Sequence, residues 1–489
     1  MANRVAPVDR ILRGRRWLLL LLAALIASRL CHVGILWTEE DLPLAAALQV
    51  LKGSVLYRDV WFDKPPLTAL VYVLWGAQTG WILRLVGAFY VWVACVMLYR
   101  FGASLWGERE GRAAAVLCAF FLTFWIPSAV IPLAADLLML VPHVAAVYLA
   151  SRGRPLAGGA AAGVAFLFNS KAVFVLAACG LWNWRAVPKL VLGFLVPNVL
   201  AFGALASAGA LGAWHEQVWE LGKLYASHTF LDEPLQTGAA RTLNWMGFHA
   251  AAILAALWFW RRERGNLRWI MAAWVGLSLA AVAAGWRFFP RYYVQLLPPV
   301  MLAAARGFTL LEGRWRLAVA ALLLVPLVRF GPRYALLAAD LATGREHTWS
   351  DIAMNQDSQR ATRIVSAAAK PGDTLFVWGY RPDIFAYTRL KAGTRFLECQ
   401  PMTGVFADRH LFQAEPLAPE LTLRNRTELA RSRPTFVVDG LSLYNRRLAI
   451  SQYPELREWF AHYVEIGRTP STVVYRRHAA ASSPDSLPR

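Results

Sequence analysis

The sequence predicts a polytopic α-helical membrane protein that ends in a small α/β domain. Hydrophobic residues make up 57% of the 489-residue chain, and its mean hydropathy of +0.39 is higher than that of soluble proteins. The apolar residues gather in runs about as long as a bilayer is thick, with cations clustered between them. A net charge of +20 arranged in this way indicates membrane topology and excludes the basic face of a soluble nucleic-acid-binding protein.

The first membrane span is predicted at residues 17–36. It follows a cluster of arginines, as a secretory signal would, but no small-residue cleavage site follows the apolar run, so we expect a retained helix. Hydropathy predicts about eleven spans in all. The others fall near residues 80–99, 113–130, 133–150, 155–168, 172–184, 190–209, 244–260, 269–285, 292–305 and 315–330.

The cations between the spans predict the orientation of the chain. Alternate connections are rich in arginine, and the opposite connections are longer but carry few cations, so the positive-inside rule predicts a cytoplasmic N-terminus. An odd number of spans then places the residues after about 335 outside the cytoplasm. The cytoplasmic cations are Arg100, Arg109, Arg112, Arg152, Arg154, Arg185, Lys189, Arg261, Arg262, Arg264, Arg268, Arg306, Arg314 and Arg316.

Two domains and a tail follow from this pattern. We expect a membrane domain over residues 1–335, whose outer loop 37–79 contains interfacial helices, one of them at 44–51. Residues 336–480 read as an outer α/β domain, and residues 481–489 read as a disordered tail. Within the outer domain we expect a helix at 358–369, strands at 374–378, 435–439 and 472–475, and a helix that ends near Val464.

Three consecutive carboxylates, Glu39, Glu40 and Asp41, directly follow the first span. Carboxylates packed together repel one another, which can raise a pKa and produce a general base, or they can share a cation. For an isolated acidic triplet, the solvated start of a loop would be the favoured explanation. The succeeding residues favour a function, because Tyr57-Arg58-Asp59 and Asp63-Lys64-Pro65-Pro66 follow in the same loop.

This loop resembles the first outer loop of the GT-C glycosyltransferases. More narrowly, it is similar to the bacterial relatives of the dolichyl-phosphate-mannose-protein mannosyltransferases and of the lipid A aminoarabinose transferase. In that family a loop carboxylate serves as base or electrostatic partner, and the lysine of the Lys-Pro-Pro run holds the carrier phosphate. The resemblance assigns these roles to Glu39 or Glu40 and to Lys64, with Arg58 and Asp63 as loop residues. Pro43 replaces a common tyrosine, and Asp41 remains an alternative base.

Two further candidates lie at the outer ends of predicted spans. Asp136 begins the span 133–150, where an acid is also favoured by the helix dipole. The resemblance implies that it is a second catalytic acid facing the first loop. Lys171, in Asn169-Ser170-Lys171, would reach a carrier phosphate, although a lysine at a membrane boundary can also snorkel to water.

The last candidates lie in the segment WRFFPRYYVQLLPP at residues 286–299. An interfacial aromatic belt with two snorkelling arginines would explain much of this composition. The pattern nevertheless resembles the late spans of the same family, in which a cation and tyrosines lie near the phosphate. Arg291 and Tyr292 are therefore predicted to bind the donor phosphate, and Arg287 to contact the substrate. Arg291 stands where the family commonly has histidine.

The resemblance implies transfer of a hexosyl or pentosyl group from a polyprenyl-phosphate donor to a lipid, glycan or protein acceptor. The reaction would take place at the periplasmic face of a bacterial inner membrane and invert the anomeric centre. The sequence requires no metal or other cofactor, although paired acids could hold Mg²⁺ or Mn²⁺. The alternative is a transporter or flippase of a lipid-linked saccharide, which would favour inverted repeats and ionisable residues at the midplane. The sequence shows neither feature.

Overall fold

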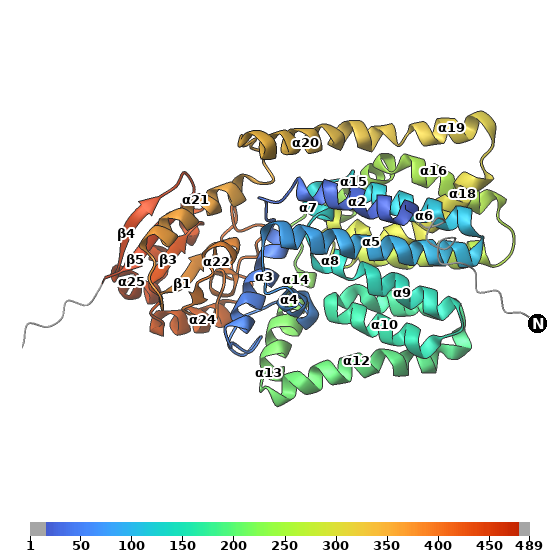
Figure 1. Cartoon of the computed structure of the whole chain (residues 1–489). Coiled ribbons are helices and arrows are strands. Elements are labelled where there is room, and N and C mark those ends of the chain that lie inside the picture. The colour runs from blue at the N-terminus through green and yellow to red at the C-terminus, as the bar shows by residue number, and fades with distance from the viewer. Residues whose placement is uncertain (1–15, 479–489) are drawn as a thin grey trace, which may run out of the picture. The chain divides into compact units, whose positions relative to one another are not determined.

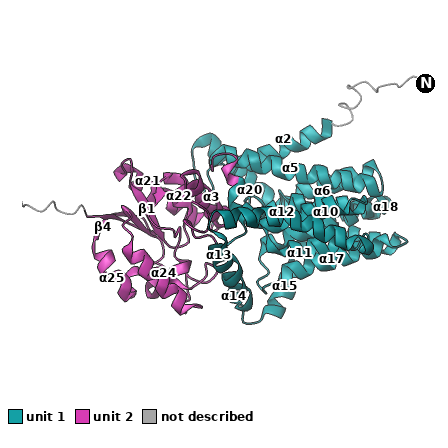
Figure 2. Cartoon of the chain, turned by 90° about the horizontal axis from the view of Figure 1, so that it is seen from below, with its two compact units in different colours: residues 1–35, 63–71, 78–349 teal, residues 36–62, 72–77, 350–489 magenta. Residues whose placement is uncertain are grey.

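The computed structural model describes residues 16–478 and is predominantly helical (Figure 1). The arginines that precede Arg16 and the predicted tail 481–489 lie outside the described residues. The chain divides into two compact units (Figure 2). Unit 1 comprises residues 1–35, 63–71 and 78–349, and unit 2 comprises residues 36–62, 72–77 and 350–489.

Unit 1 is built from helices joined by short turns. The helix α4, Pro66–Val73, begins in unit 1 and ends in unit 2. The other elements of unit 1 are α2 Arg16–Leu30, α5 Gly80–Leu105, α6 Glu108–Phe121, α7 Pro127–Val130, α8 Ala135–Leu138, α9 Leu140–Ser151, α10 Pro155–Phe168, η1 Ser170–Ala172, α11 Val173–Gly180, η2 Trp184–Ala186, α12 Val187–Ser207, α13 Leu211–Trp214, η3 His215–Glu220, α14 Leu221–Ser227, α15 Pro234–Phe248, α16 Ala250–Arg262, α17 Leu267–Ala283, η4 Pro290–Leu296, α18 Leu297–Leu310, α19 Gly313–Ala321 and α20 Leu324–Thr343.

Three helical stretches of the described chain are long and apolar enough to cross a membrane: Gly80–Leu105, Trp184–Ser207 and Gly313–Thr343. A fourth is added if α15 and α16, which meet at a 90° bend, are taken as one span. Hydropathy predicted about eleven spans because it averages over apolar residues and does not register breaks in a helix. The predicted span 133–150, for example, is divided between α8 and α9, and the predicted span 292–305 between η4 and α18.

Glycines allow α10 and α12 to pack backbone against backbone. A Cβ atom on Gly159 would lie 2.0 Å from the carbonyl oxygen of Leu190, and one on Gly193 would lie 2.1 Å from that of Leu156. Helices in an apolar environment gain contact area through such small residues, which explains their use at this crossing. The end of α10, which carries Asn169 directly after it, is thereby fixed against α12.

Unit 2 is an α/β unit around a five-stranded mixed sheet of order β2-β1-β3-β5-β4. The strand β1 is parallel to β2 and β3, and β5 is antiparallel to β3 and β4. The strands are β1 Thr374–Trp378, β2 Lys391–Ala392, β3 Phe436–Asp439, β4 Tyr463–Arg468 and β5 Val473–Arg477; the helices are α3 Thr38–Leu51, α21 Ala353–Ala368, α22 Asp383–Thr388, α23 Gln400–Thr403, α24 Pro419–Arg431, η5 Arg446–Leu448, η6 Ile450–Gln452 and α25 Pro454–Ala461.

The predicted strands at 374–378, 435–439 and 472–475 are confirmed to within two residues, and α21 lies where a helix was expected. Val464 was predicted to end a helix, but α25 ends at Ala461 and Val464 lies in β4. The strand was missed because Glu465, Gly467 and Arg468 make it mostly exposed, so it lacks the apolar alternation of a half-buried strand.

The division of the chain differs from the sequence boundary in two places. The helix α20 continues to Thr343, so the first residues beyond 335 are part of a long helix of unit 1. Most of the predicted outer loop groups with unit 2, because α3 packs against α22 and the backbone N–H of Trp61 donates to the carbonyl of Arg395 at 2.7 Å.

Candidate active site

Unit 1 contains a cluster of polar side chains from three separate segments, which we call the Asp136 cluster. Asp136 lies in the first turn of α8 and is buried. Asn169 and Lys171 lie at the break between α10 and α11, where the Asn169 side chain caps η1 by accepting from the Lys171 backbone N–H at 3.1 Å. The members are Asp136, Asn169, Lys171, Arg291, Tyr292 and Gln295, the last three from η4.

The Asp136 carboxylate is held by two amide donors on one oxygen and by an ion pair on the other. Asn169 Nδ2 donates to Oδ1 at 3.1 Å, and Gln295 Nε2 reaches the same oxygen at 3.5 Å. The Nε of Arg291 lies 3.7 Å from Oδ2, and the two side chains are 21% and 5% exposed. The carboxylate therefore connects the break after α10 to η4, and it holds Arg291 in place.

Lys171 supplies a second cation to the cluster. Its Nζ lies 3.2 Å from the centroid of the Tyr292 ring, within cation–π distance. The same nitrogen is buried and has no hydrogen-bond acceptor among residues 16–478. A buried ammonium without an acceptor is costly, and a nearby anion would remove that cost. With Arg291 beside it and Asp136 as the neighbouring carboxylate, the cluster is suited to an anionic ligand.

Arg287 is fully buried and bonded to backbone oxygens. Its guanidinium donates to the carbonyls of Tyr225 at 2.6 Å, His228 at 2.7 Å and Gly285 at 3.1 Å. These bonds fix the turn that leads into η4, in which Trp286 has a positive φ of 53°. Such backbone is strained in residues other than glycine, and it is found at functional sites. Arg287 thus anchors the segment that carries Arg291 and Tyr292.

The Lys-Pro-Pro segment is tied to the same part of unit 1. Lys64 Nζ pairs with Asp63 Oδ1 at 3.1 Å, and both side chains are one-quarter exposed. In α4, which follows, the Thr68 hydroxyl donates to the carbonyl of Phe168 at 2.9 Å. Phe168 directly precedes Asn169, so this bond connects the Lys64 segment to the break that holds Lys171.

The three consecutive acids belong to unit 2 and lie on a helix. We expected a helix only from residue 44, but α3 begins at Thr38, so Glu39, Glu40 and Asp41 form its first turn. Acids are favoured there by the helix dipole, which explains the earlier start. Glu40 and Asp41 are buried, and Glu39 is half-buried. Arg58 is exposed and pairs with Asp59 at 2.9 Å.

Asp41 interacts with Asp383, an acid that the sequence did not identify as a candidate. Burial raises the pKa of Asp41 well above its usual range, and the charges of Asp383, Glu40 and Glu39 raise it further. Burial also raises the pKa of Asp383, but Arg381 and a 3.0 Å bond from Asn355 Nδ2 to Oδ2 favour its charged form. Asp41 Oδ1 has no hydrogen-bond partner among the described residues, so Asp41 is the acid that takes up a proton.

No group of three or more His, Cys, Asp or Glu side chains in residues 16–478 is arranged to hold a metal ion. The interacting carboxyls of Asp41 and Asp383 number only two, and Arg381 supplies positive charge to both. Asp383 was not found from the sequence because Trp378 to Asp383 read only as a strand-to-helix turn. Its position at the start of α22 was the one available signal.

The fold of the described chain is similar to that of two solved structures of one protein. The chain is similar to the crystal structure of ArnT from Cupriavidus metallidurans bound to undecaprenyl phosphate, with a TM-score of 0.62, 15% identity, and coverage of 95% of this chain and 99% of that chain. The apo form of that protein gives a TM-score of 0.58, 16% identity, and coverage of 95% and 98%. No protein-family model matches the sequence, and no curated protein sequence does so.

Proposed function

We propose that the chain is a membrane glycosyltransferase that moves a sugar from a polyprenyl-phosphate donor to an acceptor outside the cytoplasm. The observation that carries this proposal is the buried Lys171 ammonium, which has no acceptor among the described residues and lies in a cluster with Arg291. Such a site favours a phosphate group. The fold adds support, because the similar ArnT structure was determined with undecaprenyl phosphate bound.

Transfer from a phosphate carrier requires cations that stabilise the departing phosphate. We assign this task to Lys171, Arg291 and Lys64, with the Tyr292 ring supporting the Lys171 ammonium. Asp136 is assigned a positioning role and not that of a base, because one oxygen accepts from two amides and the other pairs with Arg291. Removing Asp136 would release Arg291 from the cluster.

The acceptor must also lose a proton, and we assign the base to Glu39. It is the most exposed of the three consecutive acids, whereas Glu40 is fully buried. Asp41 is less suited to the task, because its burial raises its pKa and so favours the protonated form. A single displacement with Glu39 as base would invert the anomeric centre. The transferred group is a hexosyl or pentosyl unit, and the acceptor is a lipid, a glycan or a protein.

We place this reaction at the outer face of a bacterial inner membrane, with the N-terminus in the cytoplasm and the α/β domain in the periplasm. A divalent cation, Mg²⁺ or Mn²⁺, is not required by this mechanism, because the phosphate is stabilised by protein cations.

The test is consumption of defined polyprenyl-phosphate sugars by the purified protein in detergent. Glu39→Gln and Lys171→Met are expected to reduce turnover at least about a hundredfold, the usual effect of losing a general base or a stabilising charge. The matched controls are Asp41→Asn, next to the proposed base, and Lys223→Met, an exposed lysine of unit 1 that pairs with Glu220. Equal turnover by Glu39→Gln and wild type would refute the base assignment. Absence of consumption for every carrier would favour the flippase.

A further inference from the structure

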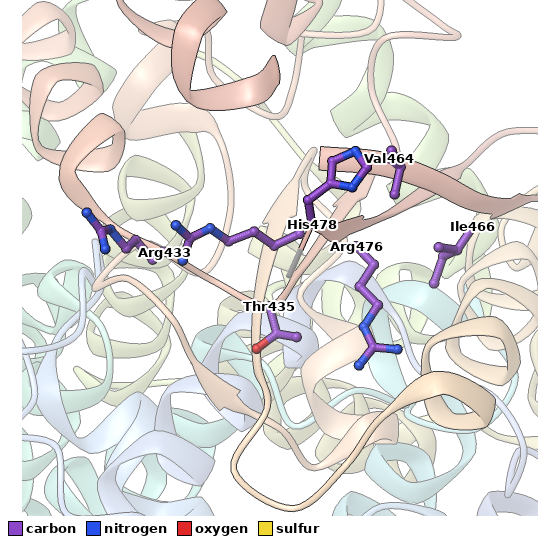
Figure 3. Close-up of a pocket in the computed structure, with 7 residues that line it drawn as sticks. Arg433, Thr435, Val464, Ile466, Arg476 and His478 are labelled. Atoms are coloured by element: carbon purple, nitrogen blue, oxygen red, sulfur yellow. The ribbon is translucent and has the colours of Figure 1, made fainter. Parts of the chain in front are cut away.

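A groove of about 570 Å³ lies on the sheet of unit 2, apart from every residue assigned above (Figure 3). Three arginines line it: Arg433, Arg476 and Arg477. Thr435 contributes a hydroxyl, and Val464 and Ile466 contribute an apolar side. The lining therefore combines a concentration of positive charge with a small apolar surface.

The sheet register explains why these residues meet. Arg476 pairs with Phe436 of β3 and with Val464 of β4, so the three side chains share one face, and the Arg476 guanidinium carbon lies 5.5 Å from the Phe436 ring centroid. The backbone N–H of Arg477 donates to the Thr435 carbonyl at 2.9 Å, which closes the end of the sheet. Arg433 enters just before β3, from the loop after α24.

The three arginines differ from most other arginines of unit 2 in having no carboxylate partner. Among the described residues, no ion pair or side-chain hydrogen bond is formed by Arg433, Arg476 or Arg477. Eight other arginines of the unit each pair with an acid: Arg58 with Asp59, Arg360 and Arg381 with Asp357, Arg395 with Glu428, Arg409 with Asp408, Arg426 with Glu455, Arg447 with Glu415, and Arg468 with Glu465. The groove thus retains uncompensated charge in a unit that pairs most of its arginines with acids.

We propose that this groove is a binding site for a phosphate-bearing ligand. A planar guanidinium offers paired N–H donors that match phosphate oxygens, and arginine is favoured over lysine at such sites. A phosphate carries up to two negative charges, so it suits a groove lined by three arginines better than a single carboxylate does. Val464 and Ile466 are 38% and 37% exposed, and they would pack against the carbon skeleton next to the phosphate. The site does not depend on the sugar-transfer reaction.

The experiment titrates the full-length protein, purified in nonionic detergent without phosphate, with inorganic pyrophosphate and measures the Kd by calorimetry. The groove variant carries Arg433→Gln, Arg476→Gln and Arg477→Gln. The control variant removes the same charge at exposed positions outside the groove, through Lys370→Gln, Arg447→Gln and Arg457→Gln. The groove variant is expected to raise the Kd at least about tenfold, because charge-assisted hydrogen bonds are lost. The control is expected to stay within twofold of wild type.

Two outcomes would overturn the proposal: no saturable binding by wild type, or an equal loss of affinity in both variants, which would indicate a response to net charge alone. An unchanged melting temperature would show that the groove variant is folded.

A second experiment identifies the source of the phosphate, with wild type and both variants in nanodiscs of neutral or anionic phospholipid. If lipid headgroups fill the groove, anionic lipid weakens pyrophosphate binding more in wild type and the control than in the groove variant. If the ligand is soluble, the lipid affects all three proteins alike.

Discussion

Replacing Asp136 with asparagine tests whether this carboxylate positions the cations of the cluster. The change keeps the shape of the side chain but removes the charge that lies 3.7 Å from Arg291 Nε. It also replaces one acceptor oxygen with an NH2 group, which cannot accept a hydrogen bond. The remaining oxygen cannot both accept from Asn169 and Gln295 and face Arg291. We expect Arg291 to lose its fixed position while the helices stay folded.

The size of the effect follows from the contacts. A hydrogen bond to a charged group contributes about 1.5–3 kcal/mol, and Asp136→Asn removes the charge from the bonds with Asn169 and Gln295 and from the partly exposed ion pair with Arg291. A loss of about 2 kcal/mol corresponds to roughly a thirtyfold fall in kcat/KM for the polyprenyl-phosphate donor. Asn169→Ala removes a single amide donor to the same carboxylate, which corresponds to about 1.5 kcal/mol or roughly tenfold.

The assay is steady-state sugar transfer by purified variants over a range of donor concentrations. Asp136→Asn is expected to act mainly by raising the KM for the donor. The correctly placed cations bind the phosphate in the ground state as well as in the transition state, so their displacement weakens binding in both. Asp136→Glu restores the charge and should recover part of the loss. Two results would refute the positioning role: Asp136→Asn stays within twofold of wild type, or kcat alone falls and the pH profile loses its acidic limb, as removal of a base would require.

The remaining predictions concern other parts of the molecule. Asp41→Asn is expected to keep transfer within about twofold of wild type, since Asp41 serves no base function in this mechanism. Because its pKa is raised on folding, native Asp41 holds a proton that the unfolded chain releases, so wild-type stability falls as the pH rises above the unfolded pKa. Asp41→Asn should therefore raise the melting temperature at alkaline pH, and the gain should vanish under acidic conditions; a pH-independent gain would contradict this. Gly159→Ala forces a Cβ against the Leu190 carbonyl and should lower the melting temperature by about 3 °C or more, whereas Gly203→Ala, with open space around it, should not.

The sequence predicted an element most accurately where neighbouring residues alone determine its bounds. The strand β1 and the helix α10 have the bounds predicted for them, because an apolar run between turn residues defines each one. The division of several apolar runs into two helices was not predicted, since a break such as that between α15 and α16 depends on how the bent pieces pack. Hydropathy measures composition and carries no information on that packing.

The sequence identified some residues of the candidate site and missed others. Asp136, Lys171 and Arg291 were singled out one by one from separate segments, and the structure brings them into one cluster. The amides of Asn169 and Gln295 that join them were not identified, because a neutral amide gives no signal in a sequence. The interaction of Asp41 with Asp383 joins two segments far apart in the chain, and only the packing of α3 on α22 reveals it.

The central claim is that the sugar leaves its phosphate carrier, and ³¹P NMR measures this directly. Purified protein in detergent is incubated with a polyprenyl-phosphate sugar and a mixture of candidate acceptors. We expect the phosphodiester resonance of the donor to be replaced by the monoester resonance of free polyprenyl phosphate. We also expect this conversion to be lost in Lys171→Met and retained in Lys223→Met. A donor that remains entirely a phosphodiester with every sugar offered, or a conversion that Lys171→Met leaves unchanged, would contradict the account.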